Sequence, residues 1–282
     1  MKSQFLQVEA GRIAYDDEGD GPPVVMIPGM LDSRESYRFL RPLLVEAGYR
    51  VVTMDIRGYG ESSIDWDDYS YAAQGRDITT LVAHLDAGPA VLVGNSYAAG
   101  SIMCAAAESP ELVAGVVPIA SFVPNLPVGP VKRALLALVG RAVVAFPAVW
   151  GVYLKMAYPT APPADFAEYR ARSVDALPAR RKATRAYVTA GPMGEEWLDR
   201  VTCPALVVMG TADPDFADPT AVAGLQAARM GASQALIEGA GHYPQAEFPE
   251  ALAEALLPFL ARTHRSSTLT GSFAPTVSTS AA

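Results

Sequence analysis

The stretch Val91-Leu92-Val93-Gly94-Asn95-Ser96-Tyr97-Ala98-Ala99-Gly100 combines the features that decide the fold. An apolar β-branched run stops at Gly94, a serine follows, and an alanine-rich helical stretch begins at Ala98. This order predicts a strand, a sharp turn with a hydroxyl at its apex, and a helix. Tight packing at such a turn requires small residues two positions from Ser96, and Gly94 and Ala98 satisfy that requirement. The alternative is an ordinary turn in which Ser96 caps the helix.

Short apolar segments alternate with helical patterns on both sides of this stretch. Strands are expected at residues 5–9, 12–15, 24–27, 50–54, 91–94, 112–119, 205–209 and 234–237. Helices are expected between them at residues 34–47, 71–86, 98–107, 219–229 and 249–262. Most of the strands are apolar on both faces, which predicts an α/β fold with a mostly parallel central sheet and helices on both faces.

The alternation breaks after Ser121. Residues 124–195 contain several prolines and no clear strand, but have helical patterns at residues 132–146, 149–157, 165–174 and 178–189. We therefore expect an α/β core formed by residues 1–123 and 196–263, with residues 124–195 inserted as a helical cap. The Ser/Thr-rich segment 264–282 has few core-forming residues and is expected to be a disordered tail.

Residues 135–157 are apolar over about the length of a membrane span. Arg141 and Lys155 interrupt the apolar run, and Pro147 stands in its middle. Because proline breaks a helix, two helices joined at Pro147 are favoured over a span. Their apolar residues on all sides require a second buried face, from either a dimer contact or an apolar cavity.

The chain has 282 residues, of which 50% are hydrophobic, and this suits one large domain or a domain with an insertion. Its net charge of −8 argues against nucleic acid or an anionic membrane surface as a partner. No phosphate-binding glycine pattern or metal-ligand cluster is present, so no cofactor or metal is expected. A disulfide between Cys104 and Cys203 is an open but disfavoured alternative, since both lie in segments expected to be buried. The first residues show no signal-peptide pattern, and a cytoplasmic location is expected.

A serine nucleophile needs a base within reach and a third group that orients the base. The chain has three histidines. His84 lies inside an expected helix and His264 begins the expected tail, whereas His242 lies in a glycine-rich loop after a short strand. Loops at the carboxyl ends of strands are where α/β sheets place their sites, so His242 is the predicted base.

The predicted acid is Asp213, which directly follows a turn at the end of the strand at 205–209. Asp215 and Asp218 are rivals for the role, although Asp218 precedes Pro219 and fits a helix N-cap better. The corresponding position after the strand at 112–119 has no carboxylate, which also favours Asp213.

Taken together, these segments resemble the α/β-hydrolase fold family, of the type with a helical cap inserted after the sixth strand. Residues 94–98 look like the nucleophile elbow of that family, and residues 55–62 match its D-x-R-G-x-G-x-S turn. The chain order Ser96, Asp213, His242 is also the order found in the family.

The resemblance covers about residues 5 to 262 and implies an oxyanion hole made by the backbone N–H groups of Met30 and Tyr97. Pro28-Gly29-Met30 occupies the place where family members usually carry His-Gly-x. Although Pro28 replaces the usual histidine, the donors are backbone groups, so the hole can be retained.

Serine at the elbow narrows the expected chemistry, because relatives that open epoxides or displace halide carry aspartate there. Ser96 implies acyl transfer, and we expect a serine hydrolase that acts on a small to medium-sized apolar carboxylic ester or lactone through an acyl-enzyme. Alternatives are a cyclase or acyltransferase of secondary metabolism, a cofactor-free lyase or perhydrolase, and a hydrolase-like ligand receptor. The oligomeric state is not predicted. The substrate pocket is expected to be lined by Leu31, Phe122, Leu138, Phe146, Trp150 and Tyr153, unless the cap residues among them simply pack the cap onto the sheet.

Overall fold

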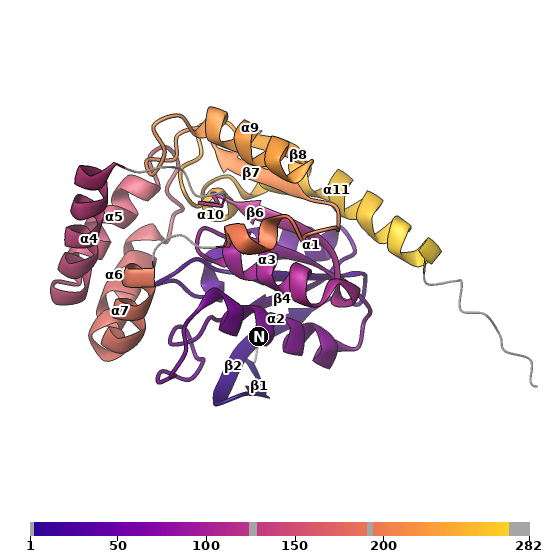
Figure 1. Cartoon of the computed structure of the whole chain (residues 1–282), viewed down its shortest axis with the longest axis horizontal. Coiled ribbons are helices and arrows are strands. Elements are labelled where there is room, and N and C mark those ends of the chain that lie inside the picture. Colours follow the sequence, from indigo (N-terminus) through magenta and orange to yellow (C-terminus); the bar gives the residue numbers. More distant parts are fainter. Residues whose placement is uncertain (1–2, 124–128, 191–193, 271–282) are drawn as a thin grey trace, which may run out of the picture.

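The computed structural model describes residues 3–123, 129–190 and 194–270 (Figure 1). Within these residues eight strands form one sheet in the order β1-β2-β4-β3-β5-β6-β7-β8. The strands are β1 (Gln4–Val8), β2 (Gly11–Glu18), β3 (Pro23–Ile27), β4 (Arg50–Met54), β5 (Ala90–Asn95), β6 (Val113–Ile119), β7 (Leu206–Gly210) and β8 (Ser233–Ile237). β1 and β2 pair antiparallel, as do β2 and β4, and all other pairs are parallel. The expected mostly parallel sheet is confirmed.

Helices cover both faces of the sheet (Figure 1). Those of the α/β part are α1 (Leu40–Glu46), α2 (Tyr71–Leu85), α3 (Ala98–Glu108), α9 (Pro219–Met230), α10 (Pro244–Glu247) and α11 (Pro249–Thr270). Alternate residues of β5 supply the two halves of the core. Leu92 packs in the cluster that contains Ile78 and Ile102 of α2 and α3, whereas Val91 and Val93 pack in the cluster of α1 and α11.

Two helices of the α/β part differ by several residues from the sequence expectation. The helix expected at residues 34–47 is split into a 3₁₀ turn at Arg34–Tyr37 and α1. The split places Pro42 in the first turn of α1, where its missing N–H is not needed, and a continuous helix would place it in the interior. At the other end, α11 continues to Thr270, so the expected disordered tail from residue 264 is wrong as far as residue 270, and residues 271–282 lie outside the described part.

The segment between β6 and β7 is helical in its described residues. It contains α4 (Pro130–Ala145), α5 (Ala148–Ala157), α6 (Phe166–Ala176), a 3₁₀ turn (Leu177–Arg180), α7 (Arg181–Ala190) and α8 (Glu195–Leu198). The break between α4 and α5 at Pro147 is the one expected from the sequence. No helix in the described residues is long and apolar enough to cross a membrane.

The turn at residues 55–62 joins β2, β4 and the 3₁₀ turn at Arg34. The Asp55 carboxylate accepts the backbone N–H groups of Arg34 and Glu61, each at 2.8 Å. Gly60 has a φ of 55°, and a Cβ there would lie 1.9 Å from the Asp55 carboxylate, so only glycine fits. Ser62 donates to the Asp55 carbonyl oxygen at 3.0 Å, which closes the turn.

The arginine of this turn forms a buried ion pair with α2. Arg57 donates to both carboxylate oxygens of Asp77, at 2.6 and 2.8 Å, and the two side chains are only 4% and 2% exposed. A bidentate pair of this kind compensates the loss of hydration of both groups. Removing one partner would leave the other charge buried without compensation.

We therefore expect Asp77→Ala to lower the free energy of unfolding by about 3–5 kcal/mol, because Arg57 stays buried and unpaired. The measurement is urea unfolding followed by circular dichroism. The matched control is Asp199→Ala, which breaks the exposed Arg229–Asp199 pair and should cost less than about 1 kcal/mol. Equal losses in the two variants would contradict this assignment.

Candidate active site

Ser96 stands at the apex of the turn between β5 and α3. Its φ is 53°, a left-handed conformation that a non-glycine residue rarely adopts. The Ser96 N–H donates to the Ile119 carbonyl at 2.7 Å, which anchors the turn to β6. A Cβ at Gly94 would lie 2.8 Å from the Ala98 carbonyl oxygen. The close approach of strand and helix therefore requires glycine at Gly94 and holds Ser96 in its strained conformation.

The loop after β3 lies directly against Ser96. A Cβ at Gly29 would be 3.2 Å from the Ser96 Cβ, and the following loop contains Leu31 with a φ of 63°. Within the described residues, neither the Met30 nor the Tyr97 backbone N–H donates a hydrogen bond to another backbone or side-chain group. Two unpaired N–H groups beside a serine are the arrangement that an oxyanion hole needs.

His242 is held on three sides and is 1% exposed. Its Nδ1 lies 2.8 Å from Asp213 Oδ2, and Asp213 is 2% exposed. The His242 carbonyl accepts a hydrogen bond of 3.0 Å from the Asn95 side chain, and its backbone N–H donates to Ala157 at 3.0 Å. We call residues 238–243, between β8 and α10, the histidine loop. Because Asn95 directly precedes Ser96, this bond ties the histidine loop to the turn that carries Ser96.

A second carboxylate reaches the same imidazole nitrogen. Asp215 Oδ2 lies 3.3 Å from His242 Nδ1 and accepts the Tyr153 hydroxyl at 2.8 Å. The Asp215 backbone N–H donates to Asp213 Oδ1 at 3.0 Å. Asp213 is the nearer and more deeply buried of the two rivals, so the geometry favours it as the partner of His242.

The two carboxylates change the basicity of the imidazole. Burial alone lowers the pKa of His242, but the negative charges of Asp213 and Asp215 outweigh burial and raise it from 6.5 to about 9. His242 is therefore largely protonated at neutral pH in the free protein and becomes a base as the pH rises toward 9.

The same three side chains meet the distance requirement of a metal site, since their ligand atoms lie within 4.8 Å of one another. In the structure the Nδ1 of His242 is directed at the carboxylate of Asp213, which is the arrangement of a positioned general base. The hydrogen bond between His242 and Asp213 accounts for the closeness of these side chains.

The residues expected to line a pocket separate into two groups. The rings of Phe122 and Tyr153 lie with their centroids 6.0 and 6.3 Å from that of His242. Trp150 stacks on Tyr153, with 4.9 Å between ring centroids. Leu31 is buried in the loop after Met30.

The expectation that Leu138 and Phe146 line the pocket is wrong. These two residues are 60% and 67% exposed and do not roof a closed pocket. The C-terminal half of α4 packs on α7, where a Cβ at Gly140 would meet Val188 at 3.3 Å. That contact leaves Leu138 and the α4–α5 corner in solvent.

Three positioning residues were not anticipated from the sequence: Asn95, Glu247 and Tyr169. Glu247 is buried and accepts the backbone N–H of Gly241, at 2.6 Å, and that of Thr160. It thus fixes the histidine loop against the inserted helices. Tyr169 of α6 donates a hydrogen bond to Asp32 and so connects α6 to the loop after Met30. Burial raises the pKa of Asp32 to about 6. Of these three residues, only Asn95 had a signal in the sequence that could have identified it, namely its position next to Ser96.

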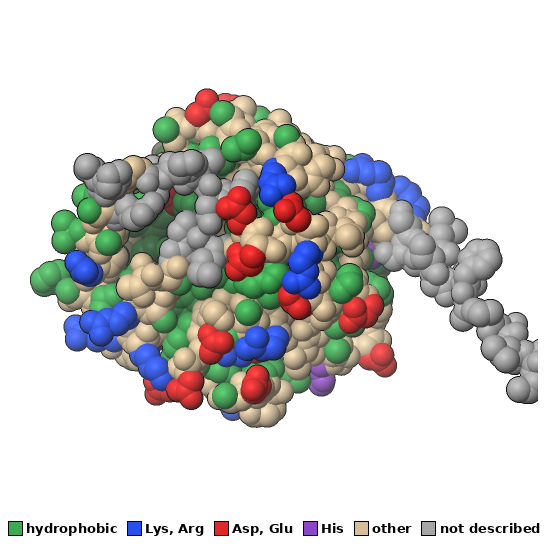
Figure 2. Space-filling view, viewed as in Figure 1, with side chains coloured by type: hydrophobic (Ala, Val, Ile, Leu, Met, Phe, Trp, Pro, Cys, Tyr) green, Lys and Arg blue, Asp and Glu red, His purple; other side chains and the backbone are tan. Residues whose placement is uncertain are grey.

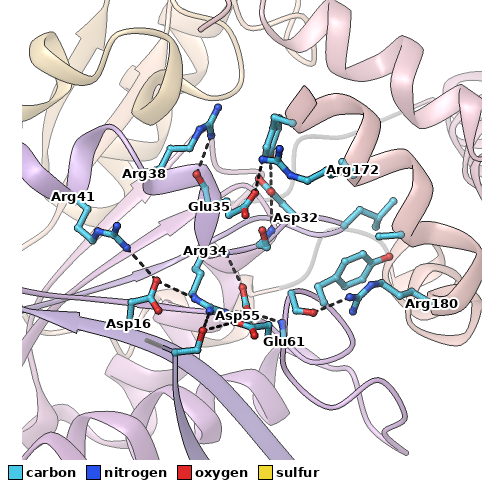
Figure 3. Close-up of a pocket in the computed structure, with 18 residues that line it drawn as sticks. Asp16, Asp32, Arg34, Glu35, Arg38, Arg41, Asp55, Glu61, Arg172 and Arg180 are labelled. Carbon is cyan, nitrogen blue, oxygen red and sulfur yellow. Dashed lines mark hydrogen bonds and ion pairs between the residues drawn. The ribbon is translucent and has the colours of Figure 1, made fainter. Parts of the chain in front are cut away.

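A cavity of about 430 Å³ lies between α6 and the loops after β3 and β4 (Figure 3). Neither Ser96 nor His242 lines it. Its arginines are paired with carboxylates of neighbouring segments, or donate to carbonyl oxygens. The pairs are Arg34 with Asp16, Asp55 and Glu61, Arg38 with Asp165, Arg41 with Asp16 and Glu18, Arg172 with Glu35, and Arg180 with the carbonyls of Gly58 and Gly60. These ionic contacts connect segments of the chain rather than leave charges open for a ligand.

Cys104 and Cys203 are both free thiols, so no disulfide joins them. His84 lies exposed on α2, and Asp218 accepts the Ala221 N–H at 2.9 Å as the N-cap of α9. These residues take no part in the cluster around His242.

Known proteins resemble this chain over most of its length. The model of the alpha/beta hydrolase family matches residues 24–255. A 2-(acetamidomethylene)succinate hydrolase of Mesorhizobium japonicum is 30% identical over 269 residues, which cover 90% of this chain and 94% of that protein. A bromoperoxidase structure from Bacillus anthracis superposes with a TM-score of 0.82 at 26% identity, covering 92% of this chain and all of that one.

Other curated relatives match over shorter segments. The bifunctional epoxide hydrolase 2 of Sus scrofa is 32% identical over 127 residues, or 44% of this chain, and the chain spans 23% of that relative's length. The chain likewise spans about a third of the length of a non-heme chloroperoxidase of Kitasatospora aureofaciens, over 90 matched residues. With the family model covering most of its length, the chain belongs to the alpha/beta hydrolase family.

Proposed function

We propose that the chain is a serine hydrolase that cleaves an apolar carboxylic ester or lactone through an acyl-enzyme on Ser96. One observation carries the proposal. His242 is hydrogen-bonded to Asp213, and its carbonyl accepts a hydrogen bond from Asn95, which precedes Ser96 in the turn. A serine in a strained turn, a base oriented by a carboxylate, and two unpaired N–H groups are the parts that acyl transfer needs.

In the proposed reaction, His242 removes the proton of Ser96 as the serine oxygen attacks the carbonyl carbon of the substrate. The N–H groups of Met30 and Tyr97 stabilise the oxyanion, each contributing about 3 kcal/mol. His242 then protonates the leaving alcohol, and water attacks the acyl-enzyme with His242 again as base. Asp213 keeps the imidazole in one tautomer throughout.

An apolar substrate is favoured by the side chains around His242. Phe122 and Tyr153 place aromatic rings beside the imidazole, and Phe122 also packs on Phe216 with 5.0 Å between centroids. In contrast, the arginines that line the cavity of about 430 Å³ form their contacts with neighbouring segments of the chain. The acyl or alcohol part of an ester would therefore contact aromatic surface.

A second candidate uses the same acyl-enzyme with hydrogen peroxide in place of water. Peroxide attack on the Ser96 ester releases a peracid and restores the hydroxyl, with its proton passing through His242. The likeness to proteins named bromoperoxidase and chloroperoxidase favours this perhydrolase activity, because a peracid can oxidise halide. Peracid formation from an ester and peroxide, measured by halide oxidation, separates it from hydrolysis alone.

Ser96→Ala is expected to abolish labelling by a fluorophosphonate probe and the burst of alcohol from a p-nitrophenyl ester, because no hydroxyl remains to be acylated. Labelling is measured by intact-protein mass spectrometry and turnover by absorbance. Ser109→Ala, at the far end of α3, is the matched control and should behave as wild type. Wild-type turnover in Ser96→Ala would refute the acyl-enzyme.

Asp213→Asn is expected to lower kcat by about 10⁴-fold, because an amide does not hold the imidazole in the required tautomer. Asp215→Asn should cost much less, since the closer Asp213 contact remains. Steady-state kinetics on one ester checks both variants. A larger loss in Asp215→Asn would exchange the roles of the two carboxylates.

The pH profile supplies a separate check. The base is active when neutral, so kcat/KM of the wild type should rise with pH up to an apparent pKa near 9. Asp215→Asn removes one of the charges that raise the pKa of His242, and the rise should therefore move to lower pH. An unchanged profile in this variant would show that Asp215 does not act on His242.

A further inference from the structure

The outer side of the inserted helices gathers exposed apolar side chains. Of the eleven large hydrophobic residues that are exposed in the described part of the chain, seven lie within residues 135–157. We call these seven the cap apolar patch: Leu135, Leu136, Leu138, Val139, Phe146, Val152 and Met156, which are 45–67% exposed. Such a concentration indicates a contact surface rather than scattered surface residues.

Residues 134–139 of α4 have no packed side. Every residue from Ala134 to Val139 is exposed, which is more than one full helical turn. Packing within the chain follows directly after this stretch, where Gly140 and Val143 are buried. An apolar helix exposed on all sides is unfavourable in water, so this part of α4 needs a partner outside the chain.

The charge of the chain is unevenly divided between the insertion and the rest. Residues 124–195 contain ten Lys and Arg against four Asp and Glu, a net +6, although the whole chain carries −8. Arg141 and Lys155 are exposed on the two helices of the patch, and Arg181 and Arg185 are exposed on α7. Among described residues, no carboxylate forms an ion pair with any of these four.

Figure 2 shows the same division. Lys and Arg side chains stand beside hydrophobic ones at the end of the molecule where Figure 1 places α4–α7, and most acidic side chains in this view lie over the α/β part. Since charges act over about 8 Å at physiological ionic strength, the local basic surface, rather than the net charge, governs what docks there.

We propose that the cap apolar patch docks on an anionic lipid surface, with its apolar side chains at the headgroup boundary and the neighbouring arginines and lysines on the headgroups. A second copy of this chain fits less well. A two-fold contact through the patch would bring Arg141 and Lys155 of both copies together, and like charges oppose such a contact. The acidic net charge had argued against an anionic surface, but the separation of charge removes that objection.

The test uses the full chain and vesicles, and it requires no turnover, so its outcome is independent of the proposed hydrolase activity. Sedimentation with phosphatidylcholine vesicles containing 30% phosphatidylserine should capture at least tenfold more protein than pure phosphatidylcholine vesicles. This capture should be lost at 0.5 M salt, because salt screens the headgroup attraction. Equal capture by the two vesicle types, or none, would overturn the proposal.

Paired variants identify the surface. Leu135→Gln with Leu138→Gln should lower capture at least tenfold, and Leu225→Gln is the matched control because Leu225 is 51% exposed on α9. Arg141→Gln with Lys155→Gln should also lower capture, with Arg265→Gln on α11 as its control. All positions are exposed, so circular dichroism should show unchanged folding. Dimers that dissociate in the Leu135/Leu138 variant, together with vesicle capture that the variant leaves unchanged, would assign the patch to a second copy and refute lipid docking.

Discussion

The left-handed backbone of Ser96 is the constraint on which the site depends. A φ of 53° at a serine is unfavourable by itself, and the neighbouring packing holds it there. Gly94 lets β5 meet α3, and Gly29 lets the loop after β3 lie against the serine. The same close approach brings the loop that carries Met30 against Ser96, and Met30 and Tyr97 are the proposed donors of the oxyanion hole. The strain at Ser96 and the closeness of the Met30 loop therefore have one cause, the tight packing of β5, α3 and the loop after β3.

The histidine loop depends on that turn through a single side chain. Asn95 is the last residue of β5 and is fully buried, and its side-chain amide donates to the His242 carbonyl at 3.0 Å. Glu247 holds the other side of the loop at Gly241. With the backbone fixed from both sides, the imidazole orientation is left to Asp213 and Asp215, whose joint charge explains why burial does not lower the pKa of His242.

Much of this arrangement could be predicted from the sequence. The strands and helices follow from apolar periodicity, and the positions of Ser96, Asp213 and His242 follow from the ends of three strands. What the sequence could not provide is the direction of side chains between segments. The contact of Asp215 with His242 depends on a turn of two residues, and the bond of Tyr169 to Asp32 depends on how α6 docks. Leu138 and Phe146 were misplaced because apolar composition alone does not distinguish the inner face of a helix from its outer face.

Helix α5 shows how one short element serves both faces. Trp150, Leu154 and Ala157 are buried, with the Trp150 indole donating to Ser173 of α6, and Tyr153 beside them reaches Asp215. Val152 and Met156 emerge on the opposite side, one turn apart. The buried side of α5 makes the contacts around His242. Packing within the chain does not account for the exposed apolar residues Val152 and Met156. A face that neither packs within the chain nor is polar enough for water requires something outside the molecule, and the basic charges beside it limit that partner to a surface of negative charge.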